Sequence, residues 1–129
     1  MMIQFFRLMC VTVLLVVAVD ARAAVVDIAW KKVGTRDVFN HESSLTEKKV
    51  GEVCGPLKKG ETVKWRFSAN APLDFNIHMH VGKEVEYFNA AKAIRSDEGT
   101  FVAPVDQDYC WMWVNREKLE ARFSVDFSR

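Results

Sequence analysis

Two histidines stand two residues apart in this 129-residue chain, at His78 and His80. If the segment around them is a β-strand, both imidazoles leave the same face of the sheet, about 6 to 7 Å apart. At that separation both rings can bind one metal ion, and copper and zinc are the ions that imidazole ligands suit. The spacing therefore predicts a candidate metal site.

Two histidines do not complete such a site, and no spacing rule selects a further ligand. The sequence offers His41, Met112, Asn76, Glu84 and Glu86. A thioether suits copper, so the metal hypothesis takes His78, His80 and Met112 as its ligands. The simpler alternative is a solvated strand face that holds the histidines, with Met79 and Met112 packed in the core. Copper or zinc is the only cofactor that the sequence suggests.

The strand after Cys110 supplies a second hypothesis for the same region. If Cys110 and Met112 point inward, the indoles of Trp111 and Trp113 point outward. An exposed aromatic patch of this kind is typical of a site for a protein partner or a small ligand such as a sugar. The opposite orientation, with both indoles buried, stays open. The candidate ligand-binding residues are Asn76, His78, His80, Trp111 and Trp113.

Catalytic motifs are absent from the sequence. It contains no nucleophile elbow around a serine, no H-E-x-x-H and no glycine-rich phosphate loop. Asp106 and Asp108 fall in a Pro-Val-Asp-Gln-Asp turn, where solvated carboxylates are common. We therefore expect a binding protein and no enzyme.

The first residues have the order of a secretory signal. Arg7 precedes an apolar run from Leu8 to Val19, and the triplet Ala21-Arg22-Ala23 follows. The run of about twelve residues is shorter than the roughly 20 that span a bilayer, so no permanent membrane anchor is expected. The prediction is a signal peptide over residues 1–23, a mature domain over residues 24–129, and a periplasmic or secreted location.

Charge and cysteine content define the mature domain further. Of the 18 basic and 17 acidic residues, Arg7, Arg22 and Asp20 belong to the leader, so the mature domain is formally neutral. This balance gives no reason to expect a nucleic-acid partner. Cys54 and Cys110 remain, and export favours a disulfide between them over a metal thiolate pair or free thiols. The oligomeric state stays open.

Alternating apolar residues recur along the mature domain, as in Val63, Trp65, Phe67 and Ala69. This period of two predicts strands with one buried face, and Gly82-Lys83 predicts a two-residue hairpin. Residues 36–48 are predicted to be a loop or a helical turn, and residues 89–97 contain a short helix-compatible piece. The predicted fold class is an all-β, antiparallel β-sandwich or jelly roll of about eight strands.

Several short motifs resemble the GOLD (Golgi-dynamics) domain family. These are Cys54, Lys59-Gly60-Glu61, the strand Leu73–Ile77, Gly99-Thr100-Phe101-Val102-Ala103 and Tyr109-Cys110, over roughly residues 52–127. The chain lacks the coiled-coil stem, membrane span and tail of the cargo receptors in that family. It also resembles small exported bacterial proteins of uncharacterised function.

The resemblance implies a jelly roll closed by Cys54 and Cys110, and a role in binding. The functional prediction is a soluble exported module that recognises a protein or a small ligand through the outer sheet face with His and Trp residues. The alternative is a periplasmic copper-binding protein that uses His78 and His80.

Overall fold

The computed structural model of this protein describes residues 24–129, so the predicted signal peptide and its cleavage site lie outside the described residues. The described chain folds into eight strands joined by turns and contains no helix, which confirms the all-β prediction. The strands are β1 (Ala24–Asp27), β2 (Lys31–Val33), β3 (Arg36–Leu45), β4 (Val50–Leu57), β5 (Thr62–Val81), β6 (Glu84–Val102), β7 (Gln107–Val114) and β8 (Ala121–Ser128).

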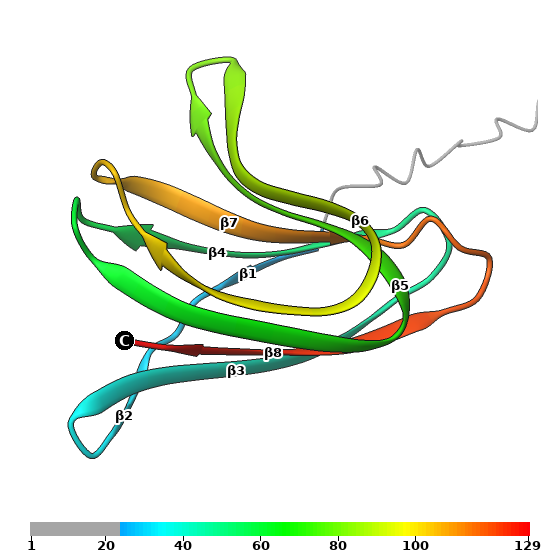
Figure 1. Cartoon of the computed structure of the whole chain (residues 1–129), viewed down its shortest axis with the longest axis horizontal. Coiled ribbons are helices and arrows are strands. Elements are labelled where there is room, and N and C mark those ends of the chain that lie inside the picture. Colours follow the sequence, from blue (N-terminus) through cyan, green and yellow to red (C-terminus); the bar gives the residue numbers. More distant parts are fainter. Residues whose placement is uncertain (1–23) are drawn as a thin grey trace, which may run out of the picture.

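The long hairpin of β5 and β6 connects two layers of one curled sheet (Figure 1). The sheet order is β1-β4-β7-β5-β8-β3-β2, and β6 pairs with β5. The first half of β5 pairs with β8 through Lys64–Ala69, whereas the second half pairs with β7 through Asp74–His78. The register shifts between Ser68 and Leu73, where β5 passes from one layer to the other. The layers thus form the predicted sandwich.

The sheet is mixed and not wholly antiparallel. β1 pairs with β4 in parallel, from Ala24 opposite Gly51 to Asp27 opposite Cys54, while the other pairs run antiparallel. β1 and β2 follow each other in the sequence but lie at opposite ends of the strand order, so they do not form a hairpin with each other.

Two segments predicted to be irregular are strands. β3 covers most of residues 36–48, and it pairs with β8 from Val38 opposite Ser128 to Leu45 opposite Ala121. Polar side chains occur on both faces of β3, because His41 and Ser43 alternate with Glu42 and Ser44, and this hid the alternation in the sequence. Residues 89–97 lie within β6, where Ala93 has a positive φ of 53° at an irregular position of the ladder. The helix-compatible prediction there was wrong.

The core fills with aromatic side chains between the two layers. On β5, Phe75 packs against both Trp65 and Phe67, and Trp113 of β7 packs against Phe67 with ring centroids 5.6 Å apart. As predicted, the apolar positions of β5 face inward up to Met79. Val81, at the end of β5, is 52% exposed because β5 runs past the body of the sandwich there (Figure 1).

Candidate functional site

The tryptophans of β7 point into the core, which is the opposite of the orientation that would expose them. Tyr109, Trp111 and Trp113 point into the core, and both tryptophans are 0% exposed. The predicted outer aromatic patch is therefore wrong. Both faces of β7 carry apolar residues, and the indoles, which have the larger apolar surface to bury, occupy the interior. Trp111 and Trp113 take no part in a surface site.

The outer face of β7 instead carries the disulfide. Cys110 is bonded to Cys54, its direct partner on β4, as predicted. Met112 lies two residues further along the same face, opposite Glu52 of β4 on one side and Asn76 of β5 on the other. The structure therefore brings Met112 to the same face as the histidines, and not into the core.

His78 occupies the centre of this outer face and is buried, with 3% of its surface exposed. It lies opposite Cys110 of β7, and its Nδ1 is 2.7 Å from Oδ1 of Asn76. Its Nε2 is 3.9 Å from Oε1 of Glu52, which comes from β4 on the far side of β7. His78 lies on the outer face, as predicted, but neighbouring side chains cover its ring.

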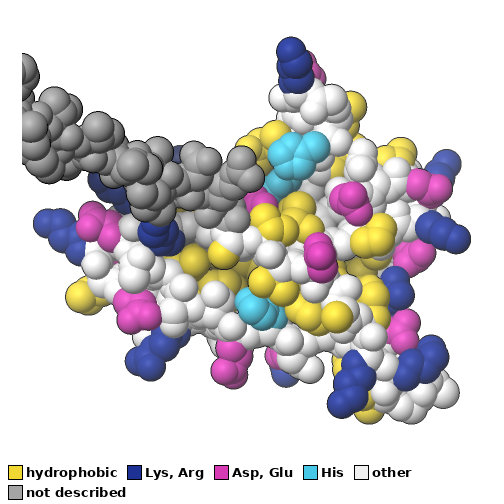
Figure 2. Space-filling view, turned by 180° about the vertical axis from the view of Figure 1, so that it is seen from behind, with side chains coloured by type: hydrophobic (Ala, Val, Ile, Leu, Met, Phe, Trp, Pro, Cys, Tyr) yellow, Lys and Arg dark blue, Asp and Glu magenta, His cyan; other side chains and the backbone are white. Residues whose placement is uncertain are grey.

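His80 is the solvent-exposed member of the pair. Its ring centroid lies 5.1 Å from that of His78 with the ring planes nearly perpendicular. Tyr87, the partner of His78 on β6, has its ring centroid 5.9 Å from that of His78. Figure 2 shows histidine and apolar side chains together below the projecting tip of the molecule. We call Glu52, Asn76, His78, His80 and Tyr87 the histidine site.

Burial controls the protonation of this site. Desolvation lowers the pKa of the His78 imidazole, and the charge of His80 lowers it further. Desolvation also raises the pKa of the Glu52 carboxyl, an effect that the charge of His80 opposes. His78 is accordingly neutral at pH 7, and we assign its single proton to Nδ1, where the Asn76 oxygen accepts it.

The sequence hypothesis did not include Glu52. The disulfide could have indicated its position. Glu52 is two residues from Cys54 on the same strand, so both side chains share a face, and the bond to Cys54 places Cys110 on that face as well. The other proposed ligands are elsewhere: His41 lies on β3 in the other layer, and Glu84 and Glu86 are exposed near the hairpin turn.

Within residues 24–129, one group of three His, Cys, Asp or Glu side chains has all of its ligand atoms close together, and it comprises Glu52, Cys54 and Cys110. Both sulfur atoms of that group belong to the disulfide, so no thiolate is available to a metal. Nothing in the described part of the chain favours copper over other ions, and the copper hypothesis receives no support.

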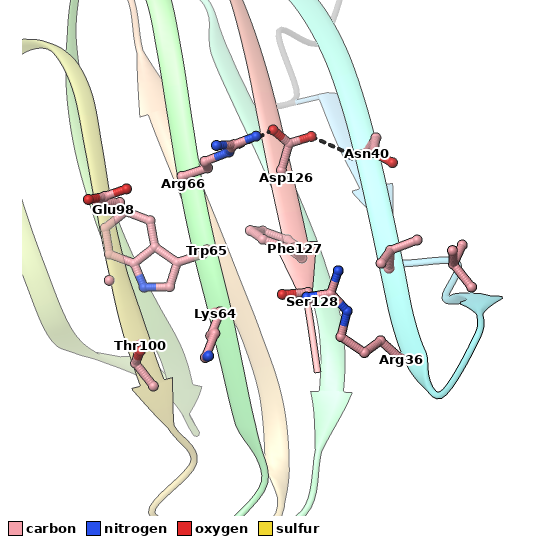
Figure 3. A pocket seen from close by; sticks show the side chains of 13 residues that line it. Arg36, Asn40, Lys64, Trp65, Arg66, Glu98, Thr100, Asp126, Phe127 and Ser128 are labelled. Atoms are coloured by element: carbon pink, nitrogen blue, oxygen red, sulfur yellow. Dashed lines mark hydrogen bonds and ion pairs between the residues drawn. The ribbon is translucent and has the colours of Figure 1, made fainter.

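A concave region crosses the outer face of the β3–β8–β5 layer (Figure 3). It is a shallow groove of about 710 Å³. Arg66 donates from Nε to Asp126 at 3.1 Å, and Asn40 donates to the same carboxylate. Lys64 and Glu98 also line it. Because its charges are mixed and exposed, this groove selects no one class of ligand.

Comparison with known proteins gives the fold and no family. No family model and no curated protein matches the chain. Among solved structures, it is similar to the pre-peptidase C-terminal domain of a collagenase from Bacillus anthracis, at 9% identity and a TM-score of 0.59. That match covers 82% of this chain and 94% of the collagenase domain.

Two further similar structures are periplasmic inhibitors of g-type lysozyme, named PliG. The Aeromonas hydrophila protein matches at 14% identity and a TM-score of 0.57, covering 83% of this chain and 98% of its own. The Salmonella Typhimurium protein matches at 12% identity and a TM-score of 0.58, covering 82% and 97%. These matches support a small β-sandwich-like fold, and the GOLD resemblance is not confirmed.

No helix within residues 24–129 combines the length and the apolar character that a bilayer crossing requires.

Proposed function

We propose that this chain is an exported binding module that recognises a protein partner through the tip of the β5–β6 hairpin and the adjoining histidine site. The observation that carries the proposal is a pair of exposed apolar side chains near the tip, Val85 and Tyr87, which are 37% and 58% exposed. They lie opposite His80 and His78 in the ladder and so share a face with both histidines, whereas Val81, 52% exposed, lies on the other face of the hairpin. Exposed apolar side chains grouped in this way mark interaction sites more often than scattered single residues do.

The hairpin is shaped to enter a concave partner. Its tip extends beyond the rest of the sandwich (Figure 1), so no other strand covers its apolar side chains. The ladder continues to the turn, where Val81 is opposite Glu84 and Gly82 adopts a φ of 61°. A paired tip of this kind loses little conformational entropy when it binds.

The fold likeness to periplasmic inhibitors of g-type lysozyme supports an exported binding role and suggests the first partner to test. In this proposal the chain acts by binding and catalyses no reaction. Tyr87 is the central contact, since tyrosine combines a large apolar surface with a hydroxyl that can bond at the edge of an interface.

The test measures binding of the purified protein to a g-type lysozyme, together with inhibition of that enzyme. We expect saturable binding that weakens at least about tenfold in a Val85→Ser, Tyr87→Ala variant. Val33→Ser is the matched control, because Val33 is a 54% exposed valine in β2, away from the hairpin. Equal loss in the control would contradict a role for the hairpin, and absence of binding would reject g-type lysozyme as the partner.

A further inference from the structure

The histidine site contains two polar atoms that face each other without a direct bond. Nε2 of His78 and Oε1 of Glu52 are 3.9 Å apart. A direct hydrogen bond would need a separation of about 2.7 to 3.2 Å. A zinc-class cation lies about 2.0 to 2.2 Å from imidazole nitrogen and from carboxylate oxygen, so one ion between these two atoms reaches both.

Asn76 orients His78 for such a role. With the ring proton on Nδ1 and donated to the Asn76 oxygen, Nε2 presents its lone pair toward Glu52. Metal-binding histidines are commonly held in this way, with the second ring nitrogen bonded to a fixed oxygen. Because His78 is buried, the direction of its lone pair is set by the fold.

His80 can supply the third ligand. The ring nitrogens of His80 do not form a close group with the ligand atoms of Glu52 and His78 in this conformation, but the ring is exposed and makes no hydrogen bond within the described residues, so it can turn toward them. The cystine beneath Glu52 contributes no ligand, because its sulfur atoms are bonded to each other.

We propose that Glu52, His78 and His80 bind one divalent cation of the zinc class. Two imidazoles and one carboxylate form the ligand set of open zinc sites, in which a fourth position is left for water or for an incoming group. Met112 is not part of this set, since a carboxylate and two imidazoles suit zinc without a thioether. The proposal goes beyond partner binding and does not depend on it.

Calorimetric titration of the purified protein with Zn(II) tests the site. The expected result is one ion per chain, bound at micromolar concentrations or tighter. Glu52→Gln and His80→Ala are each expected to weaken binding at least about tenfold, since each removes one of three protein ligands. His80 is exposed, and Glu52→Gln preserves the shape of the partly covered side chain. Mg(II), which prefers oxygen ligands, is expected not to bind.

Two matched controls complete the experiment. His41→Ala removes the histidine in the other layer, and Met112→Leu removes the thioether on the same face; both are expected to leave Zn(II) affinity unchanged. The proposal is overturned if no saturable one-to-one binding occurs up to about 100 µM Zn(II), or if Glu52→Gln and His80→Ala bind as the unmodified protein does. Equal binding of Mg(II) would also overturn it.

Discussion

Glu52 and His78 lie on strands that do not pair with each other, and their side chains meet over β7, which separates those strands. The register creates this contact, because Cys54, Cys110 and His78 are successive partners across three strands and Glu52 lies one side-chain position away on the same face. A carboxyl and an imidazole are thus both desolvated above a cystine. Their protonation should therefore be coupled to the stability of the fold.

The first prediction concerns the stability of the metal-free protein in acid. The pKa of His78 is held below the 6.5 of the unfolded chain, so the unfolded state binds more protons as the pH falls through that value. The free energy of unfolding is expected to fall between about pH 7.5 and pH 5.5 by this contribution, measured by urea denaturation with a chelator present. His78→Gln should reduce the dependence of the free energy of unfolding on pH. His80→Gln, at an exposed position, should leave most of that dependence in place.

Glu52 contributes with the opposite sign. Its pKa is raised above the 4.5 of the unfolded chain, so its contribution to stability is lost as the pH rises above 4.5 and through the folded value. Acidification from neutral pH therefore favours the folded state at this residue and offsets part of the loss at His78. Glu52→Gln is expected to steepen the loss of stability in acid. An unchanged slope in both His78→Gln and Glu52→Gln would contradict this account.

The second prediction concerns the disulfide. Cys54 and Cys110 are separated by 56 residues, and closing a loop of that length restricts the unfolded chain. Changing both cysteines to serine is expected to lower the free energy of unfolding by about 4 kcal/mol, measured by urea denaturation. Reduction of the unmodified protein with dithiothreitol should give a similar loss. A loss below about 1 kcal/mol in both experiments would show that the cross-link adds little to the sandwich.

The fold was largely predictable from the sequence because alternation is a strong signal where one strand face is buried. β5 and β8 show this alternation clearly, and the hairpin at Gly82 and the cysteine pair follow from local chemistry. β3 was missed because its outward residues are polar and its inward set includes His41 and Ser43. The passage of β5 from one layer to the other depends on pairing between distant strands, which no local pattern contains.

The candidate site was only partly predictable. The spacing of His78 and His80 placed both on one face, but the sequence could not show that His78 is covered while His80 is exposed. Trp111 and Trp113 were assigned to the wrong face because both faces of β7 are apolar, so alternation alone does not distinguish them. Glu52 was missed because it comes from a strand two positions away in the sheet.

The third prediction concerns the close contact between Gly99 and Trp65, which are opposite each other in the β5–β6 ladder. A Cβ atom at residue 99 would lie 2.9 Å from Cζ2 of the Trp65 ring, which is held in the core. Gly99→Ala is therefore expected to lower the free energy of unfolding by about 1 to 3 kcal/mol through overpacking. Thr100→Ala, at the neighbouring exposed position, should change it by less than about 0.5 kcal/mol. Equal effects would contradict the steric explanation.

The last prediction concerns Asn115, a fully buried polar residue just after β7. Its amide nitrogen donates to the carbonyl oxygens of Leu45 and Leu119, both at 2.8 Å, and its oxygen accepts from the backbone N–H of Glu117 at 2.9 Å. The side chain thus joins the end of β3 to the loop that leads into β8. Removing it leaves up to three backbone groups without a partner, each at a cost of about 1 to 3 kcal/mol if water cannot reach it.

Asn115→Ala is therefore expected to destabilise the protein by about 3 kcal/mol in urea denaturation, with faster hydrogen exchange of the Glu117 amide. Asn89→Ala, at an exposed position of β6, is the control and should change stability by less than about 0.5 kcal/mol. Asn115→Asp separates hydrogen bonding from volume, because it keeps the acceptor for Glu117 but loses the donor to the two carbonyl groups. If Asn115→Asp were as stable as the unmodified protein, the two carbonyl contacts would contribute nothing to the fold.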